Sequence, residues 1–185
     1  MKKQIILTAI LTLALFTSCS AQKLTTFSKP EVIAARETYI VDTNSHGMNL
    51  RFVRNKKYRF NEFKTNAPKD ALPYEKKDQY VDERQIAQIC LAVFSKSRIA
   101  QLALDTKNLL IDLKSDRDGN ILAVEFAFAQ TSSISPLEIE SLEKLLKAQV
   151  RAKINEKFFA GYHYISITRF VDFKNLTTNL DKAVF

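Results

Sequence analysis

The sequence predicts an α+β protein: an antiparallel sheet of about five to six strands with two main helices packed on one face. Two observations carry this prediction. Apolar residues alternate on both sides of a glycine-containing turn at 116–120, which is typical of a β-hairpin. A segment that starts at Ser135 repeats apolar residues at three- and four-residue steps, which is typical of an amphipathic helix. The elements follow in the order ββ(β)–α(α)–β–β–α–β, which favours helices on one side of the sheet.

The first part of the domain is predicted to be a β-hairpin. Residues 38–41 and 50–53 are strand-like, and turn formers occupy 44–47 between them. Residues 57–60 are predicted to add a third short strand. Residues 66–73 contain two prolines and are predicted to form a loop.

A helical stretch is predicted from 81 to 104. Its apolar stripe consists of Ile86, Ile89, Cys90, Val93 and Phe94. Residues 95–98 interrupt the stripe, and Ser97 is predicted to cap a second short helix that ends at Leu104. No basic residue lies close to Cys90 in this stripe, so a buried structural thiol is expected there.

The remaining elements have clearer signals. Strands are predicted at 109–114 and 122–128, and Gly119 in the turn between them is expected to need a positive φ. This turn lacks the downstream glutamate of a calcium loop, so we interpret it as a hairpin turn only. Pro136 and Glu138 complete a capping box with Ser135, and the helix stripe continues to Ile154. A last strand is predicted at 164–173.

The N-terminus has the features of an export signal. Lys2 and Lys3 precede an apolar stretch at 5–16, which is too short to cross a bilayer comfortably as a helix, and small residues follow at 17–21. The sequence Phe16-Thr17-Ser18-Cys19 resembles a lipobox, which implies cleavage before Cys19 and acylation of that residue. Ordinary cleavage after Ala21 is the alternative.

The predicted organisation is a signal peptide at 1–18, a tether at 19–36, one domain at 37–175 and a tail at 176–185. Several acyl chains on Cys19 would hold the protein at a membrane. Ser20 stands where an inner-membrane retention signal usually has Asp, so the resemblance implies an outer-membrane lipoprotein. No acidic run follows, and we expect it to face the periplasm.

Composition limits the function. The net charge falls from +8 to +6 when Lys2 and Lys3 leave with the signal peptide, and this positive charge favours an anionic partner in the envelope. A protein is the other partner that we consider. Export argues against nucleic acid. With only two His and two Cys, neither metal-ligand spacing nor a catalytic set is present, so no metal, cofactor or catalytic residue is predicted.

Two clusters of basic and aromatic residues are the candidate ligand-binding residues, although we favour an edge strand protected by its charges for the first cluster and core or loop packing for the second. They are Arg51, Arg54, Lys56, Lys57, Tyr58 and Arg59 in the first cluster, and Phe159, Tyr162 and His163 in the second.

From Gln85 to Phe173 the order α–β–β–α–β resembles the C-terminal domain of TonB-type energy transducers. The resemblance rests on residues 110–113, the turn at 118–120, residues 124–126, the Ser135-capped helix and the last strand. Such transducers keep an uncleaved membrane helix and a Pro-rich spacer, and neither is expected here. The chain therefore resembles a Bacteroidetes-type envelope lipoprotein of an uncharacterised family that uses a similar scaffold.

These features together predict a lipid-anchored, non-enzymatic binding or interaction module of the cell envelope. Two alternatives remain. One is an enzyme that acts on an envelope polymer through His163 and nearby tyrosines. The other is an accessory component of a TonB-like outer-membrane transport system.

Overall fold

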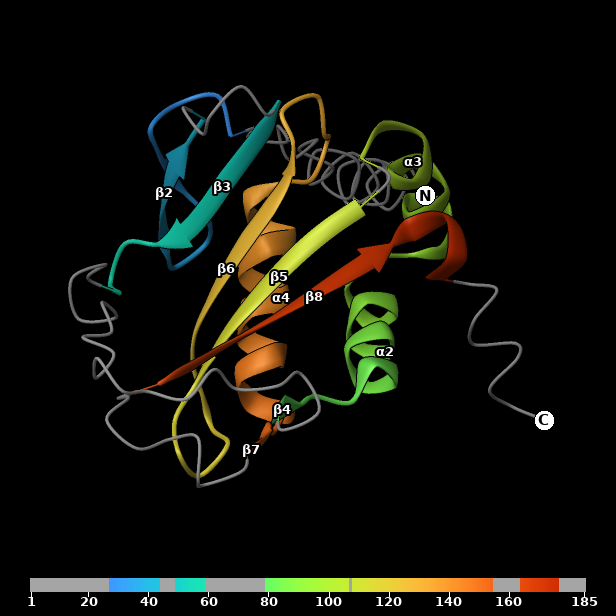
Figure 1. The fold of residues 1–185 in the computed structure, drawn as a ribbon. Coiled ribbons are helices and arrows are strands. Elements are labelled where there is room, and N and C mark those ends of the chain that lie inside the picture. The colour runs from blue at the N-terminus through green and yellow to red at the C-terminus, as the bar shows by residue number, and fades with distance from the viewer. Residues whose placement is uncertain (1–26, 44–48, 59–78, 107, 155–163, 177–185) are drawn as a thin grey trace, which may run out of the picture.

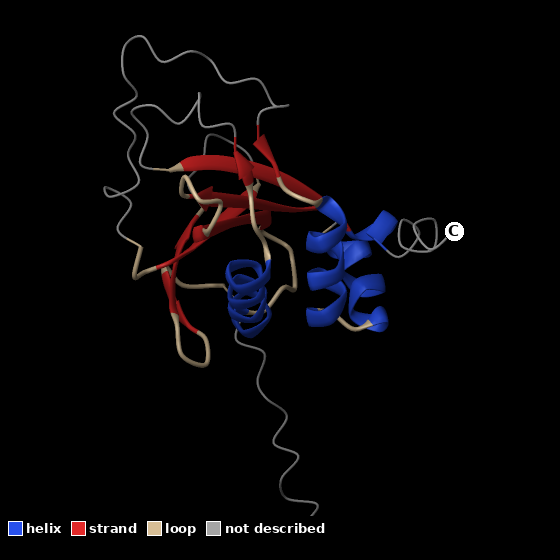
Figure 2. Ribbon diagram, turned by 90° about the horizontal axis from the view of Figure 1, so that it is seen from below, coloured by secondary structure: helices blue, strands red, loops and turns tan. Residues whose placement is uncertain are grey.

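The computed structural model describes residues 27–43, 49–58, 79–106, 108–154 and 164–176. They form a six-stranded antiparallel sheet with helices on one face, which confirms the predicted fold class (Figures 1 and 2). The strand order is β1-β2-β3-β6-β5-β8. The strands are β1 (Glu31–Ile33), β2 (Thr38–Asp42), β3 (Leu50–Asn55), β5 (Asn108–Ser115), β6 (Ile121–Ala129) and β8 (Ile165–Asp172). A separate pair joins β4 (Gln79–Tyr80) to β7 (Lys153–Ile154).

The central hairpin of β5 and β6 forms as predicted. Its turn contains Gly119 at φ 80°, in the left-handed region that glycine adopts without a steric penalty. The Asp116 side chain accepts hydrogen bonds from the backbone N–H of Asn120 at 2.8 Å and from its Nδ2 at 3.0 Å. These bonds satisfy both donors of Asn120 within the turn itself, and they fix the point at which the two strands separate.

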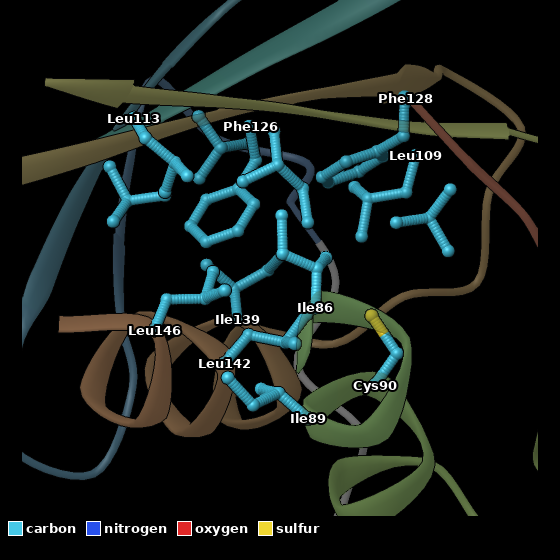
Figure 3. Packing of buried hydrophobic residues seen from close by; sticks show 14 of the residues in the cluster. Ile86, Ile89, Cys90, Leu109, Leu113, Phe126, Phe128, Ile139, Leu142 and Leu146 are labelled. Carbon is cyan, nitrogen blue, oxygen red and sulfur yellow. The ribbon is translucent and has the colours of Figure 1, made fainter. Parts of the chain in front are cut away.

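Helix α4 (Pro136–Gln149) begins with the predicted capping box, in which Ser135 and Glu138 satisfy each other's backbone N–H groups. Its buried stripe of Ile139, Leu142 and Leu146 faces the apolar side chains of the sheet (Figure 3). The helix ends earlier than predicted. Val150 is already extended, and the segment around Ile154 pairs with β4 as β7 instead of continuing the helix.

The stretch predicted as helical from 81 to 104 contains two helices, α2 (Glu83–Val93) and α3 (Lys96–Asp105). The cap of α3 is Ser95 and not Ser97, because the Ser95 Oγ accepts the Arg98 N–H at 3.2 Å. Helix α2 packs against α4, with Ile86 and Ile89 directed toward that helix, and Cys90 is the third buried residue of α2 (Figure 3). Cys90 is fully buried, as predicted, and burial raises its pKa to about 12.

The domain begins earlier than the predicted boundary. Residues 31–33, assigned to the tether, form β1 and pair with β2. Phe27 is buried, and its ring centroid lies 5.7 Å from that of Phe128. The third strand predicted at 57–60 does not form in its described part, because the chain turns at residues 56–57 after β3 ends.

The two faces of the sheet differ. The face toward the helices carries the core, with side chains such as Leu109, Leu113, Phe126 and Phe128 (Figure 3). In the described part of the chain, no helix covers the other face (Figure 2). We call this second surface the open face.

Candidate functional site

The basic stretch that starts at Arg51 divides between the two faces of the sheet. Alternation along β3 places Val53 and Asn55 with the buried residues and Arg54 on the open face. Lys56 forms a 2.8 Å ion pair with Glu31 on the surface, where such pairs contribute little. The stretch is therefore not one continuous binding strip.

Arg51 has a structural role at the start of β3. Its Nη2 donates to the Gln130 carbonyl oxygen at 2.9 Å, and its guanidinium lies 5.9 Å from the ring centroid of Phe128. Burial lowers the pKa of this side chain. These contacts hold the end of β6 against β3, and they commit Nη2 of Arg51 to the Gln130 carbonyl oxygen.

A polar cluster lies between the β2–β3 hairpin and α4. We call it the Glu143 cluster, and it comprises Tyr39, Asn55, Tyr58, Glu143 and Lys147. The Glu143 carboxylate, only 4% exposed, accepts hydrogen bonds from the Tyr39 hydroxyl at 2.7 Å and from Asn55 Nδ2 at 3.1 Å. A buried carboxylate is tolerated when donors surround it in this way.

Tyr58 and Lys147 form the outer part of the Glu143 cluster. The Lys147 ammonium group hydrogen-bonds the Tyr58 hydroxyl and lies 4.6 Å from the centroid of its ring. Lys57 lies 5.6 Å from the same centroid and pairs with Glu37 at 2.5 Å. This lysine pair holds the tyrosine ring over the edge of the cluster.

The electrostatics of the Glu143 cluster favour a structural role. Burial and the adjacent Glu143 raise the pKa of Tyr39 and of Tyr58, so both phenols stay protonated at neutral pH and act as donors. Burial lowers the pKa of Lys147. An activated tyrosine would need a lowered pKa. The cluster is a polar clamp between the hairpin and the helix.

The open face carries a second polar group, which we call the open-face network. It comprises Arg54, Asp112, Lys114, Glu125, Tyr164 and Ser166. Lys114 pairs with Asp112, and its Nζ donates to Ser166 Oγ at 2.9 Å. The Ser166 hydroxyl donates to Asp112 Oδ1 at 2.5 Å. The Lys114 Nζ also lies 5.8 Å from the ring centroid of Tyr164.

Glu125 links this network to β3. It lies opposite Arg54 across one strand pair and opposite Asp112 across the other, and its carboxylate is 4.0 Å from Lys114. Burial raises the pKa of Glu125, Lys114 opposes that shift, and Asp112 adds to it. The network therefore holds two acids and two bases close together, and burial disfavours the charged form of the Glu125 carboxylate.

An apolar row runs beside the network on the open face. The register aligns Phe52, Ala127, Leu110 and Phe170 across β3, β6, β5 and β8. Phe170 is 72% exposed, and Ile33 on β1 is 71% exposed. The open face thus combines exposed apolar side chains with a fixed set of charges.

The structure brings together only part of the predicted site. Arg54, from the first predicted cluster, lies in the same network as Tyr164, which directly follows the second. Arg59, Phe159, Tyr162 and His163 lie outside the described residues, so their predicted ligand-binding role is untested. Asp112, Lys114 and Glu125 were not predicted as site residues. Their signal in the sequence was the polar positions that alternate with apolar ones on both strands of the central hairpin.

Within the described ranges, no three His, Cys, Asp or Glu side chains come together as a metal site would require. None of the helices in the described part of the chain has the length and apolar character that a bilayer crossing needs.

No protein-family model matches the chain. No curated protein matches its sequence. Among solved structures it is similar to a DUF5043 family protein from Bacteroides uniformis, with 19% sequence identity and a TM-score of 0.62 over 77% of this chain and 84% of that one. At this identity the likeness shows the fold, and the source of the neighbour agrees with the Bacteroidetes-type resemblance of the sequence. The chain shares its fold with a protein of a Bacteroides species.

Proposed function

We propose that this protein is a lipid-anchored, non-enzymatic binding or interaction module of the bacterial cell envelope. The anchor is Cys19, and the surface that meets the ligand is the open face. The protein sits at the outer membrane and faces the periplasm. The N-terminal export signal with its lipobox-like sequence supports the proposed location, and the open face supports the binding role.

The observation that carries the binding role is the combination of side chains on the open face. Phe170 is 72% exposed on a strand that is fixed along its whole length by pairing with β5. Exposed aromatic side chains on a rigid strand lose little conformational entropy when a ligand covers them. The neighbouring network offers carboxylate, ammonium and hydroxyl groups that are already positioned by one another, which gives a ligand both apolar area and directional contacts.

Site-specific photocrosslinking tests this proposal. A photoreactive phenylalanine analogue replaces Phe170 in the full-length protein in its native host, and a matched variant carries the analogue at Arg84, which is exposed on α2 on the helix-covered side. We expect a discrete adduct from position 170 that is absent from position 84. The same weak background at both positions would contradict a binding role for the open face.

A role as an accessory of a TonB-like transport system is the second candidate. It is favoured by the order α2, β5, β6, α4 and β8, which follows the order on which the resemblance rests. Under this proposal the adduct at position 170 contains an outer-membrane receptor. An adduct that contains a soluble periplasmic protein or glycan would remove this candidate and leave the first one standing.

A further inference from the structure

The point where the described chain begins and the helix α3 lie at the same end of the molecule (Figure 1). Phe27 packs against Phe128, the penultimate residue of β6. The segment that follows β6 is bound to the end of α3, where the Ser133 hydroxyl donates to Asp105 Oδ2 at 2.5 Å. We call this region the β6 end of the domain. The turn at 116–120 lies at the opposite end of β6.

The exposed side of α3 carries few charges for a chain in which 26% of the residues are charged. It carries one base and no acid, and its residues are Lys96, Ser97, Ala100, Gln101 and Leu104. Leu104 is 84% exposed. The charged groups nearby are committed to internal contacts: Arg98 pairs with Glu138 at 2.6 Å, and Asp105 accepts from Ser133.

Such a surface suits the headgroup region of a bilayer. It has no carboxylate on its exposed side that anionic headgroups would repel, and Lys96 is attracted to them. Leu104 gains about 25 cal/mol for each Å² of apolar area that leaves water. The surface that α3 presents to the headgroups is therefore mostly uncharged, with Lys96 as its one charge and Leu104 as its large apolar side chain.

The length of chain between Cys19 and the domain limits where the membrane can be. Only the seven residues 20–26 separate Cys19 from the buried Phe27. Eight residue steps span at most about 28 Å even when fully extended. The nine residues of β6 place the turn at 116–120 about 30 Å farther along the strand. An anchored domain is thus held at its β6 end.

We infer that the β6 end of the domain, with the exposed side of α3 and Leu104, rests against the lipid bilayer when the protein is anchored through Cys19. The inference rests on the proposed lipid anchor and adds an orientation to it. The open face then runs away from the membrane along the strands and stays accessible to a ligand.

Fluorescence quenching from the lipid surface tests the orientation. The full lipidated protein is reconstituted into phosphatidylethanolamine–phosphatidylglycerol vesicles that contain a headgroup quencher. Single cysteines are introduced by Leu104→Cys and, as the matched control at the far end, by Asp118→Cys, and each is labelled with the same fluorophore. The wild-type protein, whose Cys90 is buried, reports background labelling.

We expect the label at 104 to lose most of its fluorescence and the label at 118 to lose little. Equal quenching at both positions, or stronger quenching at 118, overturns the orientation while leaving the anchor intact. A protein that does not float with the vesicles shows that the lipid anchor itself is wrong, and the orientation falls with it.

Discussion

The backbone N–H of Ala152 donates a hydrogen bond to the carbonyl oxygen of Gly119 across 2.9 Å, so the turn of the central hairpin is fastened to the segment after α4. The approach is so close that a Cβ on Gly119 would lie 2.1 Å from the Ala152 carbonyl oxygen. Gly119 also has a φ of 80°, where residues with a side chain are strained.

Replacing this glycine should therefore be costly. We expect Gly119→Ala to lower the free energy of unfolding by more than about 2 kcal/mol, because the strained φ and the backbone clash act together. Urea unfolding of a leaderless Cys19→Ala form measures the effect. Asp118→Ala, at an exposed position of the same turn, is the control and should change stability by less than about 0.5 kcal/mol. Equal costs at the two positions would contradict the docking of the turn.

Tyr39→Phe should destabilise the protein by about 1.5–3 kcal/mol, since it removes a hydrogen bond to the buried carboxylate of Glu143. The measurement is a double-mutant cycle with Glu143→Gln in urea unfolding. We expect the phenylalanine to cost clearly less in the Gln background, where no buried charge is left short of a donor. Additive effects of the two substitutions would show that the clamp does not operate as one unit.

Glu125→Gln should raise the stability of the protein at neutral pH. Burial raises the pKa of Glu125 in the fold, so its charged form is disfavoured there. The unfolded chain releases this proton near the ordinary value of 4.5, whereas the folded chain keeps it to a higher pH. Stability is thus lost as the pH rises through the folded pKa. We expect the urea midpoint of Glu125→Gln to exceed that of the wild type at pH 7 and to approach it at pH 4. A variant less stable than the wild type at pH 7 would mean that Lys114 and Arg54 more than offset the burial.

Cys19→Ala should release the protein from the membrane fraction or block its processing, because acylation requires the thiol. Fractionation of cells and the apparent mass of the product measure this. Ser18→Ala keeps a small residue before the cysteine and should leave the distribution unchanged. If the Cys19→Ala protein is processed and distributed as the wild type, cleavage after Ala21 is the better explanation.

The sequence predicted most elements because their signals are local. The capping box of Ser135 and Glu138 and the glycine turn of the central hairpin depend on residues a few positions apart, and both were found where expected. The strand β1 was not predicted, because three residues are too few to show the alternation of a strand. It is stabilised by its pairing with β2, which the local sequence does not show. The continuation of α4 to Ile154 was wrong because apolar spacing cannot distinguish a helix stripe from a strand that pairs with β4.

The site was harder to predict than the fold. The Glu143 cluster joins Tyr39 to a residue more than a hundred positions away, and only the packing of α4 on the sheet brings them together. The open-face network depends on the register that aligns Arg54 with Glu125. Alternation shows which side of a strand a residue occupies, but the strand order β3-β6-β5-β8 is a property of the whole chain.

That strand order also affects how the chain is made. The strands β1, β2 and β3 are synthesised first, yet β3 pairs with β6, whose last residue is Ala129. Until that residue has emerged, β3 offers an unpaired edge, and until α4 has followed it, the apolar side of the first three strands, with Tyr39, Val41 and Val53, has no helix to cover it. Chains that end before Gln149, the last residue of α4, should therefore need a holding chaperone, and chains that contain the whole of α4 should depend on it less.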